Sequence, residues 1–269
     1  MNQELLSLVQ KLNDPVCVKS DVIRWGSPVP SFGNLSFAKI ATVGLNPSNR
    51  EFVDVLGNEL IGPNRRFHTL NSLGLQQWDD IEQSHLSIIA DSCLEYFNRN
   101  PYDGWFKKLD NLISGTSMSY YFPSSQACHL DLIPYATSTK WTDLSIEQKN
   151  TLLEISGDSL ARLLNTSCVK LLVLNGSSVV TNFEKLSNLK FEKINMPDWN
   201  LNRKSTSHVQ GFAYKGVIES LGNIRLRNKI SVLGYNHNIQ SSFGVTSRVQ
   251  FSIRDWISES AKEIFNEAK

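Results

Sequence analysis

The chain has 269 residues, of which 41% are hydrophobic and 20% charged, and its formal net charge is +1. These values are ordinary for a globular protein and allow one domain with a substantial core. No apolar run approaches the length of a membrane span, and the first helix-like stretch, MNQELLSLVQKLND, carries acidic residues unlike a signal peptide. We therefore expect a cytoplasmic protein.

The cysteines argue against a metal centre. Cys17, Cys93, Cys128 and Cys168 are widely scattered, and the sequence contains no Cys-x-x-Cys pair. Zinc ribbons and iron–sulfur clusters need closely spaced thiolates. We expect no metal and no cofactor.

Charge is distributed unevenly along the chain. Residues 1–184 contain 14 Lys/Arg and 19 Asp/Glu, whereas residues 185–254 contain 11 Lys/Arg and 3 Asp/Glu. A basic segment of this kind suits a polyanion such as nucleic acid. Chance variation over a solvated surface is the alternative.

In chain order, the sequence pattern predicts an N-terminal helical extension followed by alternating strands and helices. The extension covers about residues 1–35. Short apolar runs predict strands at 38–44, 127–133, 169–175, 209–219 and 229–235. Amphipathic patterns predict helices at 79–98, 104–114, 145–164, 177–187 and 249–267. This order predicts a single α/β domain over residues 1–269, with three α/β/α layers and a central, mainly parallel sheet of four or five strands.

Chemistry-bearing residues follow three of the predicted strands. Ligands of such sheets bind at the carboxyl ends of the strands. The first strand ends in Gly44-Leu45-Asn46-Pro47-Ser48, the second contains Asp131 within CHLDLIPYA, and the last is followed by His237 within GYNHNIQSSFG. Taken singly, Asn46 could be a turn residue before proline and His237 a surface histidine. Together they predict a small metal-free site.

These three segments resemble, in order, the motifs of the uracil-DNA glycosylase superfamily. The first motif of that family is Gly-x-Asn/Asp-Pro after the first strand, which Gly44–Pro47 matches. Its middle motif is a strand ending in an Asn that reads the base, and Asp131 stands at that position. Its last motif is a His-containing loop, matched by residues 237–242, although the usual His-Pro-Ser is replaced by His-Asn-Ile. The resemblance covers most of residues 38–257 and implies a monofunctional DNA glycosylase.

The resemblance also implies catalytic roles. Breaking a base–sugar bond develops positive charge on the sugar and negative charge on the base, so placed charges and a positioned water can replace a strong base. Asn46 would orient the water through its side-chain carbonyl, and His237 would donate to the base oxygen. Gly44 and Leu45 would line the base site. A dinucleotide cofactor is a poor competitor, because no G-x-G-x-x-G follows the first strand.

The target base must leave the duplex, which requires an aromatic platform, a wedge and phosphate contacts. Phe67 is the expected stacking residue and Phe52 the alternative, while an ordinary core position for Phe67 is equally open. The wedge would lie in Gln240–Phe243, which includes Ser241 and Ser242. The phosphate contacts expected from the basic segment are Lys204, Arg225, Arg227, Lys229 and Arg248.

Two positions bear on the identity of the base. An ionised carboxylate can only accept hydrogen bonds, so Asp131 suits an exocyclic amine, as on cytosine, and His129 could serve cytosine N3. Relatives that exclude 5-substituted pyrimidines have a Tyr after the motif proline, where this chain has the small Ser48. The expected substrate is a C5-substituted cytosine, such as the glucosylated hydroxymethylcytosine of phage DNA, attacked as an antiviral defence.

Three alternatives remain open. One is a repair glycosylase for uracil or another deaminated base. Another is a hydrolase of free nucleosides or nucleotides, and the third is a non-catalytic nucleic-acid-binding protein. We expect DNA as the partner, no membrane association and a monomer.

Overall fold

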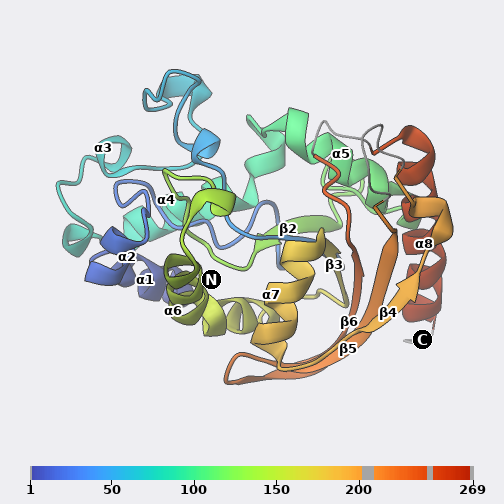
Figure 1. Cartoon of the computed structure of the whole chain (residues 1–269). Helices are drawn as coiled ribbons and strands as arrows, with labels where there is room; N and C mark the ends of the chain where they lie inside the picture. Colours follow the sequence, from blue (N-terminus) through green and yellow to red (C-terminus); the bar gives the residue numbers. More distant parts are fainter. Residues whose placement is uncertain (1, 202–208, 241–244, 267–269) are drawn as a thin grey trace.

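The computed structural model describes residues 2–201, 209–240 and 245–266. At its centre is a six-stranded sheet in the order β2-β1-β3-β6-β5-β4 (Figure 1). The strands are β1 (Ile40–Gly44), β2 (Ala127–Asp131), β3 (Leu171–Asn175), β4 (Glu192–Asn195), β5 (Phe212–Leu221) and β6 (Ile224–Tyr235).

The sheet is mixed. Strands β2, β1, β3 and β6 run parallel, β5 is antiparallel to β6, and β4 is antiparallel to β5. The predicted α/β class with a mainly parallel sheet is confirmed, but the sheet has one strand more than the four or five expected. The additional strand is β4, in which three of the four residues are exposed, so no apolar run marks it in the sequence.

The helices of the described residues follow the predicted order. They are α1 (Asn2–Lys11), α2 (Pro15–Lys19), α3 (Leu70–Leu73), α4 (Gln83–Leu94), α5 (Asp103–Ile113), α6 (Ile146–Asn165), α7 (Ser177–Ser187) and α8 (Ser247–Asn266). The predicted helical extension over residues 1–35 is helical only to Lys19. Helix α6 begins at a capping box, in which Ser145 Oγ accepts from the Gln148 amide and the Gln148 side chain accepts from the Ser145 amide.

The sheet is covered on both faces. Alternate residues of a strand point to opposite faces, and in β3 Leu172 and Leu174 join one hydrophobic core while Leu171 and Val173 join the other. The first core includes buried side chains of α1, α6 and α7, and the second those of α5 and α8. Burial on both faces explains why β1 is apolar almost without alternation.

The four parallel strands end together at one edge of the sheet. Gly44 of β1 pairs with Asp131 of β2, and Asn175 of β3 pairs with Tyr235 of β6. The long β5–β6 hairpin instead extends beyond the amino end of β3, because Leu171 pairs only with Ser231, seven residues into β6 (Figure 1). Within the described ranges, no helix has the length and apolar character needed to cross a bilayer.

Candidate active site

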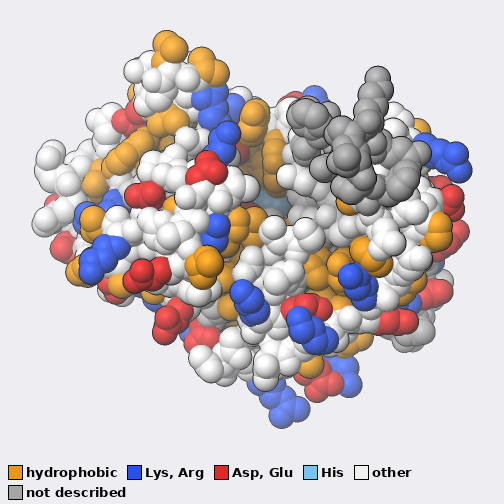
Figure 2. All heavy atoms as spheres, in the orientation of Figure 1, with side chains coloured by type: hydrophobic (Ala, Val, Ile, Leu, Met, Phe, Trp, Pro, Cys, Tyr) orange, Lys and Arg blue, Asp and Glu red, His pale blue; other side chains and the backbone are white. Residues whose placement is uncertain are grey.

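Two cavities lie side by side where the parallel strands end. The larger has a volume of about 420 Å³ and the smaller of about 250 Å³. Both are lined by Asn46, Pro47, Ser48 and Trp105, which therefore form a shared wall. Figure 2 shows this face hollowed near its centre, with hydrophobic side chains in the hollow. The first predicted motif thus borders both cavities.

Asn46 is held by its amide nitrogen. Nδ2 donates to Thr137 Oγ1 at 3.1 Å, to the Tyr135 carbonyl at 3.4 Å and to the Pro47 carbonyl at 3.2 Å. Carbonyl oxygens only accept, so the amide must present its nitrogen to them. The side-chain oxygen makes no hydrogen bond to any described residue, which leaves it free to accept from a ligand or a water.

Asp131 and His129 come from alternate positions of β2 and line the smaller cavity together. Both are buried, and His129 Nε2 lies 3.4 Å from Asp131 Oδ1. On its other side, His129 Nδ1 lies 2.7 Å from Thr42 Oγ1, which also bonds to the Tyr120 hydroxyl. A proton on Nε2 avoids placing two acceptors face to face.

Gly44, Leu45 and Ser48 shape the walls around these groups. Gly44 and Leu45 line the larger cavity. A Cβ on Gly44 would overlap Asp131 Oδ1 and come within 2.9 Å of His129 Nε2, so this position requires glycine. Ser48 is exposed and lines both cavities, and its Oγ accepts from the Arg50 amide at 3.2 Å.

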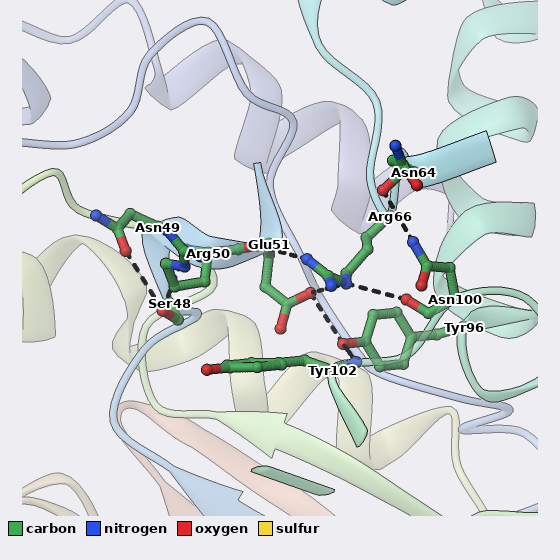
Figure 3. A network of polar contacts seen from close by, with 9 residues as sticks. All are labelled: Ser48, Asn49, Arg50, Glu51, Asn64, Arg66, Tyr96, Asn100 and Tyr102. Atoms are coloured by element: carbon green, nitrogen blue, oxygen red, sulfur yellow. Dashed lines mark hydrogen bonds and ion pairs between the residues drawn. The ribbon is translucent and has the colours of Figure 1, made fainter. Parts of the chain in front are cut away.

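A carboxyl group that sequence reasoning missed also lines the smaller cavity. Glu51 is only 3% exposed, and its Oε2 accepts from the Tyr96 hydroxyl at 2.9 Å (Figure 3). The Arg66 guanidinium lies 3.9 Å from Oε2 but donates to the carbonyls of Arg50 and Asn100. Burial is therefore the largest effect and raises the pKa of Glu51 to about 7. The hydrogen bond from Tyr96 and the charge of Arg66 lower this pKa, but by less.

The aromatic residues predicted to stack on a base do not line either cavity. Phe67 is buried and stacked on Tyr96 with ring centroids 5.2 Å apart, and Phe52 packs edge-on against Trp25. The structure thus gives Phe67 the core position left open as its alternative. The aromatic side chains that line the smaller cavity are Phe32, Tyr102, Trp105 and Phe106.

His237 lies in the loop after β6 but lines neither cavity. It is 3% exposed, and its Nε2 donates to the Trp199 carbonyl at 2.7 Å. Burial lowers its pKa, with the hydrogen bond to Trp199 opposing the shift. Its neighbours Asn236 and Asn238 line the larger cavity instead. In this conformation the imidazole has no free N–H for a base.

The predicted wedge is described only in part. Gln240 lines the larger cavity, and its Oε1 accepts from Asn175 Nδ2 at 3.0 Å. Asn175 Oδ1 in turn accepts from the Tyr235 hydroxyl, which ties this loop to the ends of β3 and β6. Ser241 and Ser242, and the predicted phosphate contact Lys204, lie outside the described residues.

The other predicted phosphate contacts are not gathered at the cavities. Along β6, Lys229 lies six residues before Tyr235, and Arg225 lies ten residues before Tyr235. These separations correspond to about 20–34 Å along an extended strand. Arg227 lies between them. Lys229 pairs with Glu219, and Arg248, near the start of α8, pairs with Asp198. The basic side chains that do line the cavities are Arg50 and Lys140.

The sequence carried only weak signals for the residues it missed. Glu51, Arg50 and Tyr102 lie in short turns or caps without periodicity, and a buried carboxyl in such a turn is invisible before the fold is known. Among the described residues, no cluster of three or more His, Cys, Asp or Glu side chains could hold a metal ion.

No protein-family model matches the chain, and no curated protein is significantly similar to it.

Proposed function

We propose that the protein is a DNA glycosylase that hydrolyses the N-glycosidic bond of a flipped pyrimidine and leaves an abasic site. The observation that carries the proposal is Asn46. Its amide nitrogen is anchored by three acceptors and its carbonyl oxygen is free, at the wall shared by two cavities. This arrangement suits a residue that holds a water.

In the proposed reaction the C1′–N bond breaks and its electron pair leaves with the base. The water held by Asn46 bonds through its oxygen to C1′ and releases a proton, which neutralises the departing base directly or through solvent. The cation-like sugar and the anionic base develop without a strong base, so positioning supplies the main catalytic effect. Any role for His237 requires its imidazole to leave the Trp199 carbonyl.

The smaller cavity is the proposed base pocket. Its aromatic walls can stack on a base, and the carboxylate of Asp131 can accept from an exocyclic amine. Ser48, in the turn after β1, also lines this cavity and leaves space that a larger side chain would fill. These features favour a cytosine with a C5 substituent, such as the hydroxymethylated or glucosylated cytosine of phage DNA, over uracil.

A panel of duplexes tests the proposal. The protein is incubated with otherwise identical duplexes that contain uracil, cytosine, 5-hydroxymethylcytosine or its glucosylated form, and abasic sites are scored by alkaline strand cleavage. We expect release of a C5-substituted cytosine. Release of uracil alone would identify a repair glycosylase, and release of no base from any duplex would contradict the glycosylase assignment. Hydrolysis of free nucleosides that duplex DNA fails to inhibit would favour the nucleoside hydrolase.

A further inference from the structure

The carboxyl group of Glu51 has one oxygen committed to the protein and one free. Oε2 accepts a hydrogen bond from the Tyr96 hydroxyl and faces Arg66, whereas Oε1 makes no hydrogen bond to any described residue (Figure 3). Burying a carboxyl costs free energy unless both oxygens are satisfied. Since Glu51 lines the smaller cavity, Oε1 is the group available to a ligand there.

Glu51 lies on the same stretch of wall as Ser48. The two residues belong to one turn, in which the Glu51 amide donates to the Ser48 carbonyl at 3.0 Å. Arg50 lines the same cavity, and one of its guanidinium N–H groups donates to the Asp54 carbonyl. Two polar side chains, those of Arg50 and Glu51, therefore belong to the same stretch of wall as the small Ser48.

Asp131 and His129 approach the cavity from β2, whereas Ser48 and Glu51 approach it from the turn after β1. Under the proposed function, Asp131 accepts from the amine on C4 of the base. The neighbouring ring atom is C5, and a substituent on C5 would extend toward a different part of the wall from that occupied by Asp131.

The ligand group that best fits Glu51 is a hydroxyl. With a pKa of about 7, the side chain is present both as the acid and as the carboxylate at neutral pH. An acid can donate one hydrogen bond, whereas a carboxylate can only accept. A protonated carboxyl keeps acceptor capacity, so an amine can donate to either form but cannot use the O–H of the acid, and a carbonyl has no hydrogen bond to the carboxylate. A hydroxyl can donate to the carboxylate and accept from the acid, so it is the group that matches both forms.

We propose that Glu51 is a specificity-determining residue that hydrogen-bonds a hydroxyl on the C5 substituent of the flipped cytosine. This inference rests on the proposed glycosylase function. It assigns the space beside Ser48 to a hydroxyl-bearing group, so a methyl group of similar bulk would fit but leave Glu51 Oε1 without a partner.

The test compares 5-hydroxymethylcytosine with 5-methylcytosine in otherwise identical duplexes, under single-turnover conditions. We expect Glu51→Leu to lower the ratio of their release rates by about 10- to 100-fold, the usual effect of one buried hydrogen bond to an ionisable group. Glu51→Gln keeps a donor and an acceptor in place and should retain most of the ratio. Glu51→Met serves instead of Glu51→Leu if the latter does not fold.

Asp110→Asn is the matched control, because Asp110 is a partly buried carboxyl whose pKa is also raised by burial but which lines neither cavity. It should leave the ratio unchanged. An equal loss of both releases in Glu51→Leu, or no change in the ratio, would overturn the inference while the glycosylase function stands. If the wild-type protein releases no base, or uracil alone, that result contradicts the proposed substrate itself, and this inference is contradicted with it.

Discussion

His129 Nε2 lies 3.4 Å from Asp131 Oδ1 in a wall of the smaller cavity. Behind this pair, Thr42 and Tyr120 extend a buried polar chain from the His129 Nδ1 atom into the core. Side chains held in this way have little freedom to adapt to a ligand. Under the proposed function, a base that enters this cavity must match the polar atoms that β2 presents, so we expect the pair to determine base choice.

Asp131→Asn should change this choice. The amide has nearly the same size but adds a donor, so it suits the carbonyl on C4 of uracil as well as the amine of cytosine. We expect the ratio of uracil to cytosine-type release to rise about 10- to 100-fold, as for about 1–3 kcal/mol of discrimination. Parallel assays of both duplexes measure it. Asp91→Asn, on an exposed position of α4, is the control and should not move the ratio.

Asn46→Ala should separate catalysis from binding. Removing the group that holds the water is expected to slow base release about 10²- to 10³-fold, similar to the loss of one preorganised donor in other enzymes. Affinity for the duplex, measured by a gel-shift assay, should change little. Full activity in the variant would show that Asn46 is only a turn residue. Binding of the duplex by both proteins, with no base release by either the variant or the wild type, would instead favour a non-catalytic nucleic-acid-binding protein.

Thr137→Val provides a graded companion to Asn46→Ala. It removes one of the three acceptors that hold Asn46 Nδ2 and leaves the carbonyls of Tyr135 and Pro47. The activity of this variant should fall less than that of Asn46→Ala. A larger loss than in Asn46→Ala would assign the catalytic effect to Thr137 itself.

Ser48→Tyr should close the space beside the C5 position. The ring would occupy part of the shared wall, so release of C5-substituted cytosines should fall steeply while that of unsubstituted cytosine is retained or rises. Ser48→Ala keeps the space open and removes only the hydrogen bond that Ser48 Oγ accepts from the Arg50 amide. This loss should lower the stability of the protein by about 1 kcal/mol. Equal effects of both variants on all substrates would contradict the steric interpretation.

The raised pKa of Glu51 predicts a pH-dependent stability difference. The unfolded chain loses this proton near pH 4.5 and the folded protein near pH 7, so between these values the folded state binds more protons and its stability falls as pH rises. Glu51→Gln lacks this dependence. Its free energy of unfolding relative to the wild type should rise by on the order of 3 kcal/mol from pH 4.5 to pH 7.

Urea denaturation of both proteins at pH 5 and pH 8 measures this difference, since other titrating groups cancel in the comparison. A difference that is independent of pH would mean that Glu51 is ionised in the folded protein at low pH, and that Arg66 neutralises it more strongly than its 3.9 Å separation implies.

The sequence predicted the parts of the site that lie on strand ends. Asn46 and Asp131 directly follow or end apolar runs, and parallel pairing through Gly44 and Asp131 brings them to one edge of the sheet. The predicted positions of the helices and strands agree with the structure for the same reason, because periodic burial marks both kinds of element in the sequence. Strand β4 lacks that signal and was missed.

Side-chain orientation was not predictable in the same way. Phe67 and Phe52 fill an aromatic core, and His237 turns to a carbonyl on a distant segment, contacts that no local pattern encodes. The basic residues Arg225, Arg227 and Lys229 were assigned to the site from charge alone. The length of the β5–β6 hairpin, which carries them to the other end of the sheet, depends on where its strands pair.

The wall formed by Asn46, Pro47, Ser48 and Trp105 belongs to both cavities at once. An insertion, deletion or change of size in these few residues therefore alters two binding volumes in one mutational step. At these positions the two cavities would therefore change together in descendants of this chain. Diversification toward new substrates would begin more easily at Glu51 or Lys140, each of which borders a single cavity.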